Sequence, residues 1–220
     1  MIRGLIFCLL TASTALAQAA IPGTIQAVGS ATITFTPNQA QFTVGVVTQG
    51  TTAQDAAQQN ATLSTTVQNA LKSALGTNGN LQTLNYSVTP RYSNQQPPIL
   101  IGYTASNTVE VTSYNLSAIG NLIDVATQAG ANNVGGVSFG LQNPDPLVQQ
   151  ALTQAGKQAL AYAAAIAAGV GGKAGAVVSA IQGTAYAPIT VPGTAAGSTT
   201  PIQVGTVSIS ASVTVTVQLQ

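Results

Sequence analysis

Residues 81–113 constrain the fold more than any other part of the chain, because they contain two runs of alternating apolar and polar side chains. Successive side chains of a β-strand point to opposite faces, so each run predicts a strand with one apolar face. A polar, Pro-rich connection at residues 94–98 separates the runs, which is typical of a long β-hairpin. We expect Tyr86, Tyr92 and Tyr103 on the apolar face, packed into the core, and the rest of the chain must supply the helices that cover them.

The rest of the chain alternates between strand-like and helix-like patterns. Period-two alternation predicts strands at residues 25–35, 40–50, 137–141, 174–182 and 206–219, and Gly29 interrupts the first of them as a bulge would. Apolar side chains at helical spacing predict helices at residues 52–75, 116–129 and 144–168. The buried face expected for the last helix consists of Val148, Leu152, Ala155, Ala159, Ala163, Ile166 and Val170.

The resulting element order is ββ-α-ββ-α-β-α-ββ. Strands with one apolar face favour a mainly antiparallel sheet, whereas parallel strands are usually apolar on both faces. The sequence therefore predicts a two-layer α+β fold, in which amphipathic helices pack on one face of a mainly antiparallel sheet.

The N-terminus has the three parts of a secretory signal peptide. Arg3 supplies a positive charge, residues 5–16 are mostly apolar, and small residues precede cleavage sites after Ala17 and Ala19. We therefore predict a signal peptide at residues 1–19 and a single domain at residues 20–220. An uncleaved anchor is the alternative, although the apolar run is shorter than the ~20 residues that span a bilayer. No later segment reaches that length, so we expect a periplasmic or secreted protein with no transmembrane segment after signal cleavage.

The chain is unusually poor in charge. Charged residues make up 4% of it and hydrophobic residues 45%, whereas an average globular protein has roughly 25% charged residues. Disordered chains combine low hydrophobicity with high charge, so disorder is not indicated. Removal of the signal takes away Arg3 and the one cysteine, Cys8, and leaves four cations, four carboxylates and no thiol. A chain of zero net charge offers no basic patch to a phosphate backbone, so nucleic acid is not an expected partner.

Two short motifs match catalytic or phosphate-binding patterns, but their surroundings argue against that chemistry. Residues 136–140 match the G-x-S-x-G nucleophile elbow, yet the chain has no histidine to serve as the general base. Residues 169–173 end in Gly-Gly-Lys as a phosphate loop does, yet they close a predicted helix instead of opening one. We therefore expect a structural strand at the first motif and a helix end at the second.

The carboxylates and one asparagine also have structural explanations. Asp55, Glu110, Asp124 and Asp145 are far apart in sequence, and without His or Cys they form no evident metal-binding set. Asp55 and Asp145 are expected at helix N-termini, where a negative charge is favourable. Asn60 falls on the apolar face of a predicted helix, where a hydrogen-bonded structural role is favoured over a ligand contact. The sequence thus predicts no catalytic, cofactor-binding or metal-ligating residue, no cofactor and no enzyme.

Several short patterns occur in a characteristic order over most of the chain. They are residues 28–31, residues 51–56 with Asn60, residues 81–92, residues 101–107, residues 130–132 with 137–139, and residues 200–202. In this order they resemble the SIMPL-domain family, which includes periplasmic immunogenic and oxidative-stress-defence-type proteins of bacteria. The resemblance implies a periplasmic or envelope-associated, non-enzymatic protein that tends to oligomerise and is linked to stress defence. Residues 152–158 depart from the family pattern because they keep one charge, Lys157, so the resemblance does not extend to recognition of a partner through charge on this helix.

Two hypotheses for the function follow. The first is a self-associating structural or interaction protein of the envelope, a homo-oligomer that also contacts an unidentified envelope protein, because charge normally opposes association and is scarce here. The second is a periplasmic module that binds a small ligand or peptide, with the loop at residues 187–200 or the connection at 93–98 as the lip of its site.

Overall fold

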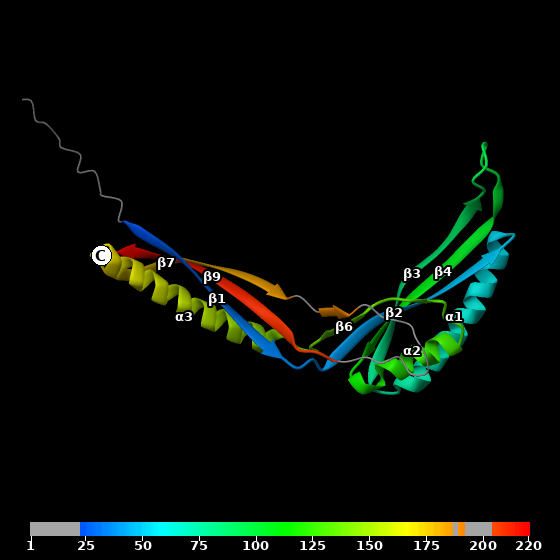
Figure 1. Cartoon of the computed structure of the whole chain (residues 1–220), viewed down its shortest axis with the longest axis horizontal. Helices are drawn as coiled ribbons and strands as arrows, with labels where there is room; N and C mark the ends of the chain where they lie inside the picture. The colour runs from blue at the N-terminus through cyan, green and yellow to red at the C-terminus, as the bar shows by residue number, and fades with distance from the viewer. Residues whose placement is uncertain (1–22, 187–188, 192–203) are drawn as a thin grey trace, which may run out of the picture.

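The computed structural model describes residues 23–186, 189–191 and 204–220, and its strands form two antiparallel sheets (Figure 1). Sheet A has the strand order β1 (Thr24–Phe35), β9 (Val207–Leu219) and β7 (Ala174–Tyr186). Sheet B has the order β3 (Gly79–Tyr92), β4 (Leu100–Ser113), β2 (Gln39–Gly50), β6 (Val137–Gly140) and β8 (Ile189–Val191), and β5 (Asn133–Val134) pairs with β2. The helices are α1 (Ala53–Leu75), the short 3-10 helix η1 (Leu116–Ala118), α2 (Ile119–Gln128) and α3 (Asp145–Gly169).

In sheet A, one face is covered by α3 through a stripe of small side chains. The buried residues of α3 recur every four positions and are all alanines: Ala151, Ala155, Ala159, Ala163 and Ala167. The helix packs on β1 and β9 and scarcely on β7. The helix lies directly against β1 at Gly29, where an added Cβ would lie 2.1 Å from the carbonyl oxygen of Ala155 and 2.3 Å from the nitrogen of Ala159. The absence of a side chain at Gly29 therefore lets the helix backbone rest on the strand.

Sheet B encloses the larger core together with α1 and α2. The largest fully buried side chains of this core are Phe42, Phe139, Leu71, Ile119 and Leu122. Thr52 caps the first turn of α1, because its Oγ1 accepts a hydrogen bond from the Asp55 N–H at 3.1 Å. Gly76, with φ of 54°, ends the helix in a conformation that glycine adopts without strain.

The two sheets lie end to end in a curved body, with the helices on the outer side of the curve (Figure 1). The connection between β1 and β2, residues 36–38, carries the chain from sheet A to sheet B. Within the described residues, each sheet therefore has one face covered by helices and one face that no helix covers. None of the helices in the described part of the chain is long and apolar enough to cross a membrane.

The predicted α+β fold with mainly antiparallel strands is confirmed, and the division of the strands into two sheets is the main difference. The bulge predicted at Gly29 is wrong, since β1 keeps an unbroken register with β9 through it. The irregular loop predicted at residues 187–200 is wrong for Ile189–Val191, which form β8 and pair with β6. Residues 187–188 and 192–200 lie outside the described residues, as does the predicted signal peptide, and the single domain at 20–220 stays a prediction.

The prediction of which α3 residues are buried is confirmed for the alanines and wrong for two larger residues. Ile166 and Val170 are exposed, although they lie at helical spacing from Ala155, Ala159 and Ala163. The physical reason is their position around the helix, because each lies on the flank beside the alanine stripe, and only the stripe faces the sheet.

Candidate functional site

The two motifs with catalytic or phosphate-binding patterns lack the geometry that their chemistry needs. Ser138 lies within β6, which pairs with β2 and β8, and its Oγ donates a hydrogen bond to the carbonyl of Gln41 at 3.3 Å. A nucleophile elbow instead places its serine on a sharp turn between a strand and a helix. Residues 169–173 begin with the last residue of α3 and end just before β7, where the helix presents carbonyl groups and not the N–H groups that bind phosphate.

The four carboxylates are distributed over the molecule. Asp55 and Asp145 lie in the first turns of α1 and α3, as predicted, while Glu110 lies in β4 and Asp124 in α2. Across residues 23–186, 189–191 and 204–220, no group of three or more His, Cys, Asp or Glu side chains lies close enough to hold a metal ion.

Asn60 is fully buried and joins α1 to sheet B. Its Nδ2 donates hydrogen bonds to the carbonyls of Val46 on β2 at 2.7 Å and Ala105 on β4 at 3.1 Å. Its Oδ1 accepts a hydrogen bond from Oγ of Ser64 at 3.2 Å. The amide thus bonds two adjacent strands and its own helix, so the structural role predicted for Asn60 is confirmed.

A second asparagine, Asn132, has a similar role that the sequence analysis missed. Its Oδ1 accepts a hydrogen bond from the Val47 N–H at 2.8 Å, and its Nδ2 donates to the Val47 carbonyl at 2.8 Å. The side-chain amide therefore pairs with β2 as a strand residue would. The available signal was its position just after Gly130, because asparagine amides near turns imitate backbone peptide groups.

The apolar face of the hairpin is only partly covered. Tyr86 and Tyr92 are 51% and 57% exposed, and Tyr103 is partly buried. The predicted core positions of Tyr86 and Tyr92 are therefore wrong. The register places Tyr86 opposite Asn107, on the side of the sheet that faces α1, but α1 covers β2 and β4 more than the edge strand β3.

Substitution of Tyr86 tests this exposure directly. We expect Tyr86→Leu to change the free energy of unfolding by less than about 0.5 kcal/mol, because its ring is largely in solvent. The same change at a buried ring, Phe42→Leu, should lower the free energy of unfolding by about 1.5 kcal/mol. Urea titrations followed by far-UV circular dichroism measure both, and equal losses would place Tyr86 in the core after all.

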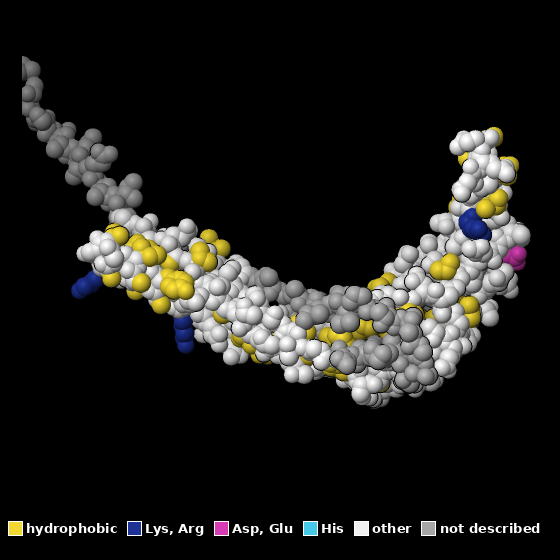
Figure 2. Space-filling view, viewed as in Figure 1, with side chains coloured by type: hydrophobic (Ala, Val, Ile, Leu, Met, Phe, Trp, Pro, Cys, Tyr) yellow, Lys and Arg dark blue, Asp and Glu magenta, His cyan; other side chains and the backbone are white. Residues whose placement is uncertain are grey.

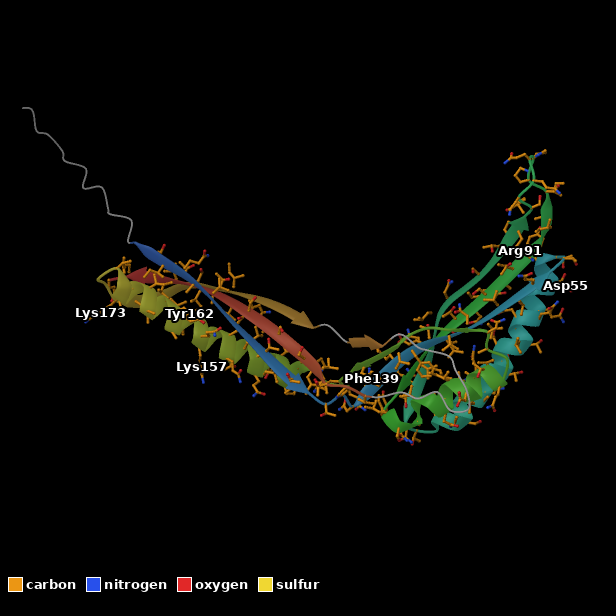
Figure 3. The ribbon with its side chains drawn as sticks, viewed as in Figure 1. Asp55, Arg91, Phe139, Lys157, Tyr162 and Lys173 are labelled. Atoms are coloured by element: carbon orange, nitrogen blue, oxygen red, sulfur yellow. The ribbon has the colours of Figure 1, made fainter. Side chains whose placement is uncertain are left out.

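Beyond the end of β2, the hairpin continues as a two-stranded arm (Figures 1 and 3). The last residue of β2, Gly50, pairs with Tyr103, whereas β3 and β4 stay paired up to Tyr92 and Leu100. At the base of the arm, the guanidinium of Arg91 donates a hydrogen bond to the side chain of Gln49. The predicted ligand site beneath the connection at 93–98 stays a prediction. A hollow of about 450 Å³ lies elsewhere, along α1, and is lined by Asp55, Gln58, Gln59, Thr62, Leu63 and Thr66.

Both outer strands of sheet A present an edge that pairs with no other strand of the described chain. β1 and β7 each pair with β9 alone among these strands, and neither contains a charged residue or a proline. Charged side chains and prolines normally keep edge strands from pairing with other molecules. The edge strands of sheet B do have such protection. One edge strand, β3, contains Pro90, Arg91 and two register shifts, and the other, β8, has three residues. Figure 2 shows several exposed apolar side chains at the sheet A end, and the charged side chains seen there belong to the lysines on and just after α3 and not to β1 or β7.

Comparison with known proteins supports the resemblance seen in the sequence. Residues 25–217 match the model of the SIMPL family, described as a protein of unknown function (DUF541). The 26 kDa periplasmic immunogenic protein of Brucella melitensis is 27% identical over 146 residues, which cover 64% of this chain and 58% of that protein. The uncharacterized protein YggE of Escherichia coli is 36% identical over 81 residues, or 36% of this chain and 33% of that protein. The matched region thus spans little more than half of the length of the Brucella relative. Because the model of the SIMPL family matches most of this chain, the chain belongs to that family.

Proposed function

We propose that this chain acts as a non-catalytic, self-associating protein of the bacterial envelope, located in the periplasm and linked to stress defence. The location is supported by the name of the Brucella relative and by the signal-peptide pattern at residues 1–19. The link to stress defence comes from the family resemblance. The chain would act by binding other protein surfaces, and the two edge strands of sheet A, β1 and β7, offer such surfaces.

The observation that carries this proposal is the pair of unprotected edges in sheet A. An exposed edge strand offers a row of backbone N–H and C=O groups that another strand can pair with. β1 and β7 have 12 and 13 residues, well above the short edges that proteins tolerate without protection. Neither strand carries a charge that would repel an incoming copy.

Association through backbone pairing and apolar contact should be insensitive to salt. Charge–charge contacts weaken when salt rises from about 0.1 M to 1 M, because the Debye length falls from roughly 10 Å to 3 Å. A chain with 4% charged residues has few such contacts to lose. We therefore expect its assembly to keep the same mass over this range of salt.

The test is the mass of the native protein, exported by a bacterial host and purified from its periplasm. We expect size-exclusion chromatography with light scattering at micromolar concentration to give a multiple of the chain mass, unchanged by salt. A monomer mass at every concentration would refute self-association. Recovery of the protein in the cytoplasm with its N-terminus intact would refute the location.

A further inference from the structure

We infer that a second copy of this chain docks on the N-terminal half of β1, residues 24–28, and on the flank of α3 that overhangs it. The inference rests on the proposed self-association and specifies the contact. β1 of one copy adds antiparallel to β1 of the other, about a two-fold axis perpendicular to sheet A. Two independent features carry it: the direction of the backbone groups of β1 and an exposed apolar stripe on α3.

The even-numbered residues of β1 direct their backbone N–H groups away from β9. Thr32 lies opposite Ser210, and their hydroxyl oxygens are 3.0 Å apart, which is typical of a pair that exchanges no backbone hydrogen bonds. Ser30 lies two residues before Thr32, so its N–H points to the same side of the strand. This N–H donates a hydrogen bond to Oε1 of Gln158 on α3 at 2.6 Å. Because bonding alternates along an antiparallel strand, Gln26 also presents its N–H at the free edge.

Gln158 identifies which flank of α3 overhangs this edge. Residues four apart on a helix lie on one stripe, so Tyr162, Ile166 and Val170 continue from Gln158 along the same flank. Their side chains are 50%, 45% and 64% exposed. Figure 3 marks Tyr162 on α3. The flank above the free edge is therefore apolar over the last two turns of the helix.

The apolar part of this flank lies over the N-terminal half of β1. The buried residues next to it, Ala163 and Ala167, pack with Ile25 and Ala27 near the start of the strand. Gln158, by contrast, reaches Ser30 in the middle of the strand. Among the described residues, backbone groups that pair with no other strand and exposed apolar side chains thus coincide at residues 24–28.

The spacing of the two helices in such a dimer suits direct packing. A strand added to β1 lies about 4.8 Å from it. Because α3 lies over β1 and β9, its axis runs above the gap between these two strands, roughly half a strand spacing from β1 on the β9 side. The two-fold axis then places the two copies of α3 about 10 Å apart, close to the distance at which helices pack. Tyr162 and Ile166 from both copies fill the space between them.

The opposite edge, β7, lacks this combination. Its register with β9 shifts twice, between Ala174 and Val177 and between Val177 and Ser179, which interrupts the row of edge groups. α3 scarcely contacts β7, so a strand added there finds no helix above it. The β1 edge is therefore the better docking surface of the two.

A matched pair of substitutions on α3 tests the inference in the full chain. Ile166 and Leu160 are 45% and 44% exposed, and they lie on opposite flanks of the helix. We expect Ile166→Lys to raise the dissociation constant of the assembly about hundredfold, because a two-fold contact contains the new charge twice. Leu160→Lys should leave the dissociation constant within about threefold of the unchanged protein, since its flank faces away from the contact. Sedimentation over a concentration series measures both.

Residue-resolved amide exchange supplies a second readout that needs no substitution. In the assembly, the N–H groups of Gln26 and Val28 should exchange slowly, while those of Thr32 and Thr34 exchange quickly at the open half of the same edge. Fast exchange at Gln26 and Val28 in an intact assembly, or equal effects of Ile166→Lys and Leu160→Lys, would overturn the contact and leave self-association standing. A monomeric unchanged protein would overturn both.

Discussion

Gly29→Ala is expected to lower the free energy of unfolding by about 3 kcal/mol, and Gly29→Val by more than about 4 kcal/mol. The new Cβ would lie 2.1 Å from the carbonyl oxygen of Ala155, and no atom pair approaches so closely without displacement. The obstacle is helix backbone, so rotation of a side chain cannot relieve it. α3 has to move away from β1, and the buried alanines then lose their contacts with the sheet.

A matched glycine in the same helix provides the control. Gly156 lies in the interior of α3, and apart from the adjacent backbone of the helix an added Cβ there would meet no described atom within 4 Å. Gly156→Ala should therefore raise the free energy of unfolding by about 0.5–1 kcal/mol, because alanine favours the helix. Urea unfolding followed by far-UV circular dichroism compares the two variants. An unfolding midpoint of Gly29→Ala equal to that of the unchanged protein would show that α3 does not rest on Gly29.

The sequence predicted the elements well because their patterns depend on local geometry. The alternation from Val207 to Leu219 and the place of Asp55 in the first turn of α1 follow from the period of a strand and from the electrostatics of helix ends. Asn60 was also interpretable, since a polar amide on an apolar helix face needs hydrogen-bond partners. Its partners, the carbonyls of Val46 and Ala105, were not predictable, because the pairing of β2 with β4 brings them together.

The errors arose where the position of one element on another decides burial. Tyr86 has the correct period for a core residue, but the coverage of β3 by α1 is a tertiary property that period cannot reveal. Ile166 likewise has helical spacing, but it lies beside the alanine stripe and not within it. The unprotected edges of β1 and β7 depended on sheet order, which their sequences alone do not give.

Asn60→Asp is expected to be the most destabilising change at a polar residue, with a loss of about 4 kcal/mol at neutral pH. The present amide donates hydrogen bonds to the carbonyls of Val46 and Ala105 from a fully buried position. A carboxylate has no N–H to donate and would face the partial negative charges of both oxygens. Asn60→Leu removes the same hydrogen bonds without adding charge, so its loss should be about 3 kcal/mol.

The pH dependence separates these two variants. Burial and the two carbonyls favour the protonated form of the introduced carboxyl, so folding raises its pKa above the unfolded value of about 3.9. The folded state of Asn60→Asp then binds a proton more tightly than the unfolded state. Its stability relative to the unchanged protein is therefore greatest below about pH 4 and falls as the pH rises toward the raised pKa.

Two comparisons make this result specific to the buried site. Asn60→Leu adds no titrating group, so its loss should be the same at acidic and neutral pH. Asn69→Asp places the same carboxyl on the exposed side of α1, where the folded and unfolded states bind protons almost equally, and its effect should stay within about 0.5 kcal/mol. Urea titrations at about pH 4 and pH 7 provide the measurement. A pH-independent loss for Asn60→Asp would mean that water reaches the site, and that the hydrogen bonds to β2 and β4 do not hold α1 on the sheet.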